Sequence, residues 1–144
     1  MTVKHGAPID TATALRDAVG RFVRSVRNQT GTATTAQSEV LAQLAREGPS
    51  SVALLAEARG VRHQSLRLVV ARLVELELLA VTPDPLDGRS QVVALTRKGR
   101  AEVKTDQAAR SAYLARTIAA RLDAREIAVL QEALGLLDRI SAAS

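Results

Sequence analysis

Hydrogen-bonding side chains gather in a short run near the middle of the chain. The run contains Arg62, His63, Gln64, Ser65 and Arg67. An arginine can pair with O6 and N7 of guanine, a glutamine with N6 and N7 of adenine, and a serine with a base or a phosphate. These residue types at the start of a helix favour contacts with base edges in a DNA groove. A solvated amphipathic helix with charged ends shows the same pattern and is the alternative interpretation.

Two short helices flank this run and would position it. The first follows Ser51, which can cap its N-terminus, and it ends at Gly60, which suits a left-handed C-terminal position. The second spans about Gln64–Leu76. Its apolar residues recur with helical spacing at Leu66, Val69, Val70 and Leu73. The pair is typical of a helix-turn-helix, in which the second helix enters the major groove of DNA.

Residues that favour β-strands replace the helical pattern after the second helix. Leu79–Thr82 and Gln91–Leu95 have strand character, and the segment 83–90 between them is rich in Pro, Asp and Gly. This pattern predicts a β-hairpin with a long loop. Arg89 in that loop could reach a minor groove, whose negative potential attracts arginine. The next residue, Ser90, is a further candidate contact with DNA.

Asp87 stands in the same loop, and its negative charge makes a phosphate contact unfavourable. We predict that Asp87 braces the loop by pairing with Arg72 or Arg89. Ordinary turn chemistry at Asp87-Gly88 explains the same residues, and both interpretations can hold together.

Positive charge is concentrated in this part of the chain. The protein has a net charge of +5, and residues 59–100 hold eight Arg and Lys against four acids, a net of +4. Such a concentration is expected of a surface that binds a polyanion. A solvated basic surface without a partner is the alternative.

Other kinds of site find little support. The 144 residues suit one domain, and one Phe, one Tyr and no Trp require an aliphatic core, which favours packed helices. There is no cysteine, and His5 and His63 are the only histidines, so we expect neither a metal nor a cofactor. Because no nucleophile–base pair or phosphate-binding glycine motif is found, we expect no catalysis. With neither a signal-peptide pattern nor a long apolar run, we expect a cytoplasmic protein.

Four further helices are expected around this central region. They cover about Asp10–Asn28, Thr35–Arg46, Arg97–Leu122 and the segment after Asp123. Asp123 and Glu126 form a capping-box pattern at the start of the last one. Apolar residues of that last helix are three and four residues apart, which favours packing against a partner helix. They are Ile127, Leu130, Leu134 and Leu137.

Several short motifs between Leu55 and Gly99 occur together in one known family. They are Leu55-Ala56, Gly60-Val61, Arg72-Leu73, Asp84-Pro85, Asp87-Gly88-Arg89-Ser90 and Leu95-Thr96 through Gly99. By these motifs, and by its helix order over nearly the whole chain, the sequence resembles the MarR family of bacterial regulators (multiple antibiotic resistance regulators). It departs from the family pattern at Leu68, Glu77 and Val81, where arginine, glycine and arginine are common.

The resemblance implies a mainly α fold with a small β-hairpin wing, assembled as a triangular homodimer. Residues 1–34 would form an N-terminal dimerisation helix, 35–98 a winged helix-turn-helix lobe, and 99–144 the C-terminal dimerisation helices. The resemblance also implies that Arg89 enters a minor groove, that Asp87 braces the wing through an arginine, and that Arg72 contacts DNA. The residues expected at the dimer interface are Leu15, Val19, Phe22, Leu114, Ile118, Ile127, Leu130, Leu134 and Leu137.

The function predicted from these features is sequence-specific binding of double-stranded DNA to regulate transcription. The regulator would act as a homodimeric repressor on a pseudo-palindromic operator. The resemblance further implies a small aromatic or anionic effector that releases the DNA. Phe22, Arg16, Arg24 and Tyr113 could line an effector pocket, but Phe22 lies on an apolar helix stripe that favours a dimer core, so no ligand site is assigned. A winged helix that serves only for protein docking or dimerisation is the alternative.

Overall fold

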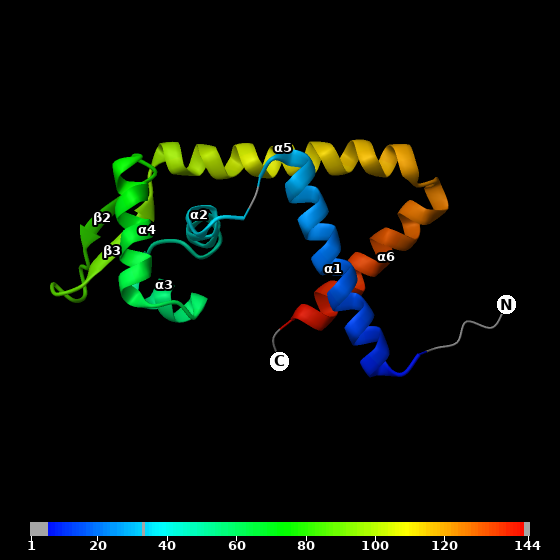
Figure 1. The fold of residues 1–144 in the computed structure, drawn as a ribbon, viewed down its shortest axis with the longest axis horizontal. Coiled ribbons are helices and arrows are strands. Elements are labelled where there is room, and N and C mark those ends of the chain that lie inside the picture. The colour runs from blue at the N-terminus through cyan, green and yellow to red at the C-terminus, as the bar shows by residue number, and fades with distance from the viewer. Residues whose placement is uncertain (1–5, 33, 143–144) are drawn as a thin grey trace. The chain divides into compact units, whose positions relative to one another are not determined.

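Capping residues set the ends of several helices in the computed structural model, which describes residues 6–32 and 34–142 (Figure 1). Thr35 and Asp123 each head a capping box, and the Ser51 side chain accepts a hydrogen bond from the backbone N–H of Leu54. Gly60 ends the third helix with a left-handed φ of 61°. The helices are α1 (Pro8–Thr30), α2 (Ala36–Glu47), α3 (Val52–Arg59), α4 (His63–Glu75), α5 (Arg97–Arg121) and α6 (Ala124–Ser141).

A small antiparallel sheet accompanies the helices. Its strands are β1 (Ser50–Ser51), β2 (Leu79–Pro83) and β3 (Gln91–Leu95), in the order β1-β3-β2. The β2–β3 hairpin was predicted, whereas β1 was not, because a strand of two residues has no readable alternation. β1 pairs with β3 and leads directly into α3, so the helix-turn-helix is tied to the hairpin through the sheet. The expected fold class, mainly α with a small β-hairpin wing, is confirmed.

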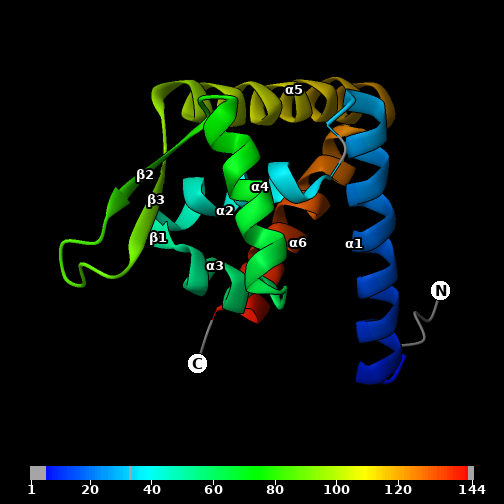
Figure 2. The ribbon, with the colours of Figure 1, turned by 60° about the vertical axis from the view of Figure 1, so that its left-hand side comes forward.

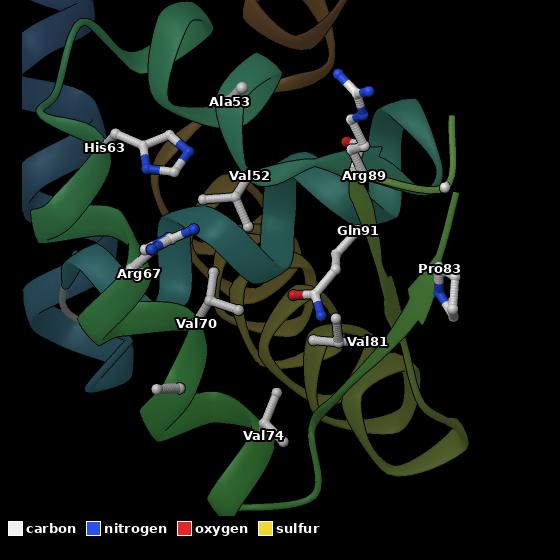
Figure 3. Close-up of a pocket in the computed structure, with 13 residues that line it drawn as sticks. Val52, Ala53, His63, Arg67, Val70, Val74, Val81, Pro83, Arg89 and Gln91 are labelled. Carbon is white, nitrogen blue, oxygen red and sulfur yellow. The ribbon is translucent and has the colours of Figure 1, made fainter. Parts of the chain in front are cut away.

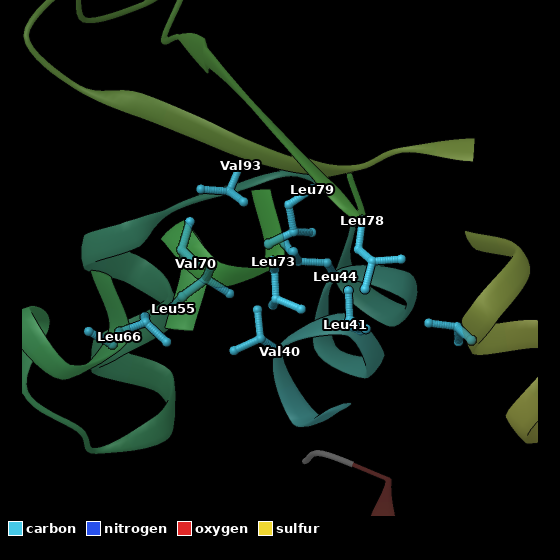
Figure 4. Packing of buried hydrophobic residues seen from close by; sticks show 12 residues of the cluster. Val40, Leu41, Leu44, Leu55, Leu66, Val70, Leu73, Leu78, Leu79 and Val93 are labelled. Carbon is cyan, nitrogen blue, oxygen red and sulfur yellow. The ribbon is translucent and has the colours of Figure 1, made fainter. Parts of the chain in front are cut away.

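By its contacts the chain divides into two units, residues 31–108 and residues 1–30 with 109–144. We call the first the lobe and the second the helical unit. The lobe has its own hydrophobic core, to which α2, α3, α4, the sheet and the start of α5 all contribute (Figure 4). Its twelve buried residues are Val40, Leu41, Leu44, Leu55, Ala56, Leu66, Val70, Leu73, Leu78, Leu79, Val93 and Val103. This core holds α4 beside the hairpin, as Figures 1 and 2 both show.

The turn between α4 and β2 is bonded to the start of α5. Thr96 donates from its hydroxyl to the carbonyl of Glu77 (2.6 Å) and from its N–H to the carbonyl of Leu78 (3.1 Å). The same hydroxyl accepts from the N–H of Gly99 (3.0 Å) and so caps α5. A Cβ at Gly99 would collide with the Leu78 carbonyl oxygen. The Leu-Thr-x-x-Gly motif thus fastens the base of the hairpin to a helix.

The helical unit has almost no core of its own. Among its described residues only Val26 of α1 is buried. Phe22 and Leu134 are 54% and 53% exposed, although each lies on an apolar stripe. None of the residues predicted at the dimer interface is buried within the chain: Leu15, Val19, Phe22, Leu114, Ile118, Ile127, Leu130, Leu134 and Leu137 are all half-buried or exposed.

Candidate nucleic-acid interface

An open groove of about 850 Å³ lies between α4 and the β2–β3 hairpin, within the lobe (Figure 3). His63 and Arg67 project into it from α4, and Gln91 projects from β3 toward them, whereas the Arg89 side chain extends away from the centre. Its floor is apolar and includes Val52, Val70, Val74 and Val81. Four predicted DNA contacts therefore line one groove: His63, Arg67, Arg89 and Ser90.

The remaining predicted contacts lie on other parts of the exposed surface of α4. Leu66, Val70 and Leu73 are at most 5% exposed and turn one side of the helix into the core. Because a helix advances by about 100° per residue, Gln64 falls opposite that side, and Ser65 and Arg72 fall on the flank away from His63 and Arg67. Arg62 is the N-cap residue of α4 and makes no side-chain capping bond. All four are exposed: Arg62, Gln64, Ser65 and Arg72.

Not every cation of the basic segment is available to a ligand. Arg59 pairs with Glu39 of α2. The Lys98 amine donates to the Leu76 carbonyl (3.0 Å), and the Arg100 guanidinium donates to the Leu95 carbonyl (3.0 Å). These three side chains join elements of the lobe to one another. The charge count alone therefore overstates the positive charge that is free to meet a polyanion.

Three arginines near the start of α4 and in the hairpin loop do not join elements of the lobe in this way. Arg62, Arg67 and Arg89 make no side-chain hydrogen bond or ion pair with any part of the chain that the structure describes. Arg72 differs, because it pairs with Glu75 one turn along α4 (3.0 Å). Within α4 and the hairpin, the uncompensated positive charge thus comes from the start of α4 and from the hairpin loop.

The hairpin loop is held by two aspartates through the main chain. The Asp84 carboxylate accepts from the N–H of Leu86 (2.9 Å), and the Asp87 carboxylate accepts from the N–H of Arg89 (3.0 Å). Asp87 therefore braces the loop by turn chemistry and not through an arginine side chain, which corrects the predicted pairing with Arg72 or Arg89. The reason is geometric: Arg72 lies on the flank of α4 away from the hairpin, where Glu75 is its neighbour.

Two residues of this surface were not predicted to contact DNA, although Leu68 was noted as a departure from the family pattern. Gln91 lines the groove, and its exposed position at the start of β3 could have been read from the alternation of that strand. Leu68 is 75% exposed on α4, and its helical phase, opposite Leu66 and Val70, could have placed it there. Within the described residues no cluster of three His, Cys, Asp or Glu suits a metal ion, and His5 lies outside those residues. No described helix has the length and hydropathy needed to span a bilayer.

Known proteins resemble both the sequence and the structure. The profile of the MarR family matches residues 32–90. The HTH-type transcriptional regulator Mb0904 of Mycobacterium bovis is 32% identical over 128 residues, which cover 88% of this chain and 89% of the relative. The HTH-type transcriptional repressor NicR of Pseudomonas putida is 41% identical over 68 residues, which cover 47% of this chain and 43% of NicR.

A solved structure agrees with these similarities over almost the whole fold. The crystal structure of a putative transcriptional regulator from Pseudomonas aeruginosa superimposes with a TM-score of 0.82 at 28% identity. The match covers 94% of this chain and 96% of the other. Because the likeness to Mb0904 also extends along most of both chains, the chain belongs to the MarR family of winged-helix transcriptional regulators.

Proposed function

We propose that the chain is a homodimeric repressor that binds a pseudo-palindromic operator through α4 and the β2–β3 hairpin. The observation that carries the proposal is a pair of arginines that line one groove, Arg67 and Arg89, and that make no ion pair within the described residues; Arg62, at the N-cap of α4, has none either. An α-helix fits the major groove of B-form DNA, and an arginine beside it suits the negative potential of a narrow minor groove. The hairpin would therefore follow the backbone while α4 meets the bases.

Each candidate residue has a chemical role in this arrangement. Gln64, opposite the core, would read adenine through two hydrogen bonds, and Arg67 would contact guanine or a phosphate. Arg89 would enter the flanking minor groove, with the loop shape maintained by Asp84 and Asp87. The other predicted contacts would position the helix on the backbone: Arg62, His63, Ser65, Arg72 and Ser90.

The exposed apolar stripes of the helical unit support the homodimer. Phe22 of α1 and Leu134 of α6 leave more than half of their surface in water in the single chain. Stripes of this kind are stabilised by packing against another chain. Two copies related by a twofold axis would present two α4 helices to half-sites one helical turn apart, about 34–36 Å.

The proposal also includes repression of transcription and release of the DNA by a small effector. NicR, similar over 68 residues, is named a transcriptional repressor. A second cavity in the lobe, of about 370 Å³, combines apolar Leu44, Leu95 and Val103 with the cation Lys104; Arg100, whose guanidinium donates to the Leu95 carbonyl, also lines it. Such a lining suits a small aromatic anion that would release the DNA. Titration with benzoate should raise the thermal unfolding midpoint of the wild type and not that of Lys104→Ala.

Binding to DNA at several salt concentrations tests the central proposal. We expect the purified protein to shift a duplex selected from a random pool, with an affinity that falls steeply as salt rises. Arg89→Ala should weaken binding and make the slope of log K against log [salt] shallower by about 2, roughly one phosphate-equivalent contact for each of two wings. Arg125→Ala, an exposed arginine of α6, is the matched control and should leave the slope unchanged.

The same experiment separates the proposal from its competitor. A folded dimer that binds no duplex, even at low ionic strength, would refute DNA binding and leave a protein-docking or dimerisation module as the function. An Arg89→Ala slope equal to that of the wild type would remove the hairpin from the interface but not α4. Gln64→Ala then serves as a second probe, because it should change sequence preference at one base pair by about 1–3 kcal/mol. Such a regulator would act in the cytoplasm.

A further inference from the structure

Leu68 is an apolar side chain in the middle of the exposed face of α4. It is 75% exposed, while Leu66 and Val70, two residues away on either side, are 2% and 5% exposed. Gln64 and Ala71, one helical turn before and after Leu68, are its neighbours on that face. Both are exposed as well. A leucine therefore stands at the centre of the helix surface that would meet the bases.

The major groove offers few partners to such a side chain. The base edges there present hydrogen-bond donors and acceptors, with one apolar group, the C5-methyl of thymine. A polar edge opposite Leu68 would lose its water without gaining a hydrogen bond, which disfavours guanine, cytosine and adenine at that point. The methyl side chain of Ala71 is short, so it leaves room for a base edge beside Leu68.

We propose that Leu68 packs against a thymine C5-methyl group and thereby specifies thymine in each half-site. This inference rests on the proposed function, in which α4 enters the major groove. Because Gln64 is one turn away on the same face, the thymine lies either in the base pair of the adenine that Gln64 contacts or in a neighbouring base pair. The half-site should therefore contain an A·T-rich step under the middle of α4.

Removal of single methyl groups from the DNA tests the proposal directly. A duplex selected by the wild-type protein is prepared with each thymine replaced in turn by deoxyuridine, which lacks only the C5-methyl. We expect one thymine in each half-site at which this change weakens wild-type binding about fourfold, as expected for loss of one buried methyl group. Leu68→Ala should bind the thymine and deoxyuridine duplexes equally well at that position.

Two further variants make the result specific. Leu54→Ala removes another exposed leucine of the lobe (60% exposed, on α3) and should keep the fourfold preference for thymine. Leu68→Arg should shift the preferred base at the same position from thymine to guanine, since arginine pairs with O6 and N7 of guanine. Because Leu68 is largely exposed, both substitutions at this position should leave the circular dichroism spectrum unchanged.

The possible failures are distinguishable. If the wild type binds its selected duplex but tolerates deoxyuridine at every position, the role of Leu68 is refuted and DNA binding stands. The same conclusion holds if Leu68→Ala keeps the full preference for thymine. If no duplex is bound at all, the proposed function fails and this inference fails with it; an exposed Leu68 would then indicate a protein partner.

Discussion

The lobe buries its apolar side chains, whereas the helical unit leaves most of its own exposed. In the lobe, twelve residues from α2, α3, α4, the sheet and α5 are buried together. In the helical unit, Val26 is the only buried residue among those described, and side chains such as Phe22 and Leu134 are more than half exposed. One unit thus buries its hydrophobic surface within the chain, and the other leaves it exposed, where a second chain would cover it in the proposed dimer.

The difference indicates which part can hold its shape unaided. The lobe combines a closed core with capped helices and hydrogen bonds that fasten the hairpin base to α5. The lobe can therefore hold α4 beside the hairpin without a second chain. The helical unit would gain its stability from dimerisation, so its state of assembly would set the spacing of two lobes.

The largest expected effect follows from a charge placed on the stripe of α6. Leu134→Asp should abolish dimerisation, because a buried unpaired charge costs roughly 3–5 kcal/mol and a twofold interface contains it twice. Sedimentation velocity measures the loss of the dimer. Leu136→Asp is the matched control: Leu136 is 54% exposed against 53% for Leu134, but it lies off the predicted seam. A Leu134→Asp protein that stays dimeric would contradict the assignment of α6 to the interface.

A cavity in the lobe core should lower the stability of the fold, whereas Leu134→Asp acts on the assembly of two chains. Leu73 is fully buried in the last turn of α4, so Leu73→Ala should lower the free energy of unfolding by about 2–5 kcal/mol. Urea denaturation followed by circular dichroism gives the value. Leu68→Ala, on the exposed face of the same helix, should change stability by less than about 0.5 kcal/mol. Equal losses for the two variants would show that the core is not where the structure places it.

This contrast also explains how far the sequence alone could lead. Helical periodicity identified the stripes of both α4 and α6, and capping residues located the helix ends near Ser51 and Asp123. Periodicity does not say whether a stripe is buried by the same chain or by another, so α6 could be assigned to an interface only through its seam spacing and the family resemblance. Local chemistry predicted the turn at Asp87, but its bonding partner depended on which flank of α4 holds Arg72.

A substitution at Gly99 tests how tightly the base of the hairpin packs against α5. An added Cβ would overlap the Leu78 carbonyl oxygen, and Leu95 also packs close by, so Gly99→Ala should destabilise the lobe by roughly 1–3 kcal/mol. Thermal unfolding measures this change. Gly135→Ala in α6 is the control. It should not destabilise the protein, since nothing lies within 4 Å of its added Cβ and alanine favours helix. Should Gly99→Ala prove neutral, the backbone contact at the hairpin base would not be tight in solution.

The smallest effect concerns strain at the turn between α4 and β2. Glu77 has a φ of 61°, which costs a residue with a Cβ about 1–2 kcal/mol. Glycine would remove that strain but would also increase the entropy of the unfolded chain, by about 0.4–1 kcal/mol. Glu77→Gly should therefore stabilise the protein by a net of about 0.5–1 kcal/mol, measured by urea denaturation. The Thr96 bond to the main-chain carbonyl of residue 77 would survive the change.

A helical glutamate gives the comparison for this last prediction. Glu57 is exposed within α3, where glycine lowers helix stability, so Glu57→Gly should cost about 0.5–1 kcal/mol. Opposite signs for the two substitutions would show that the effect comes from the positive φ at residue 77 and not from loss of a carboxylate. A destabilised Glu77→Gly protein would mean instead that the left-handed turn is relaxed in solution, with the hairpin base less tightly bonded to α5 than the structure indicates.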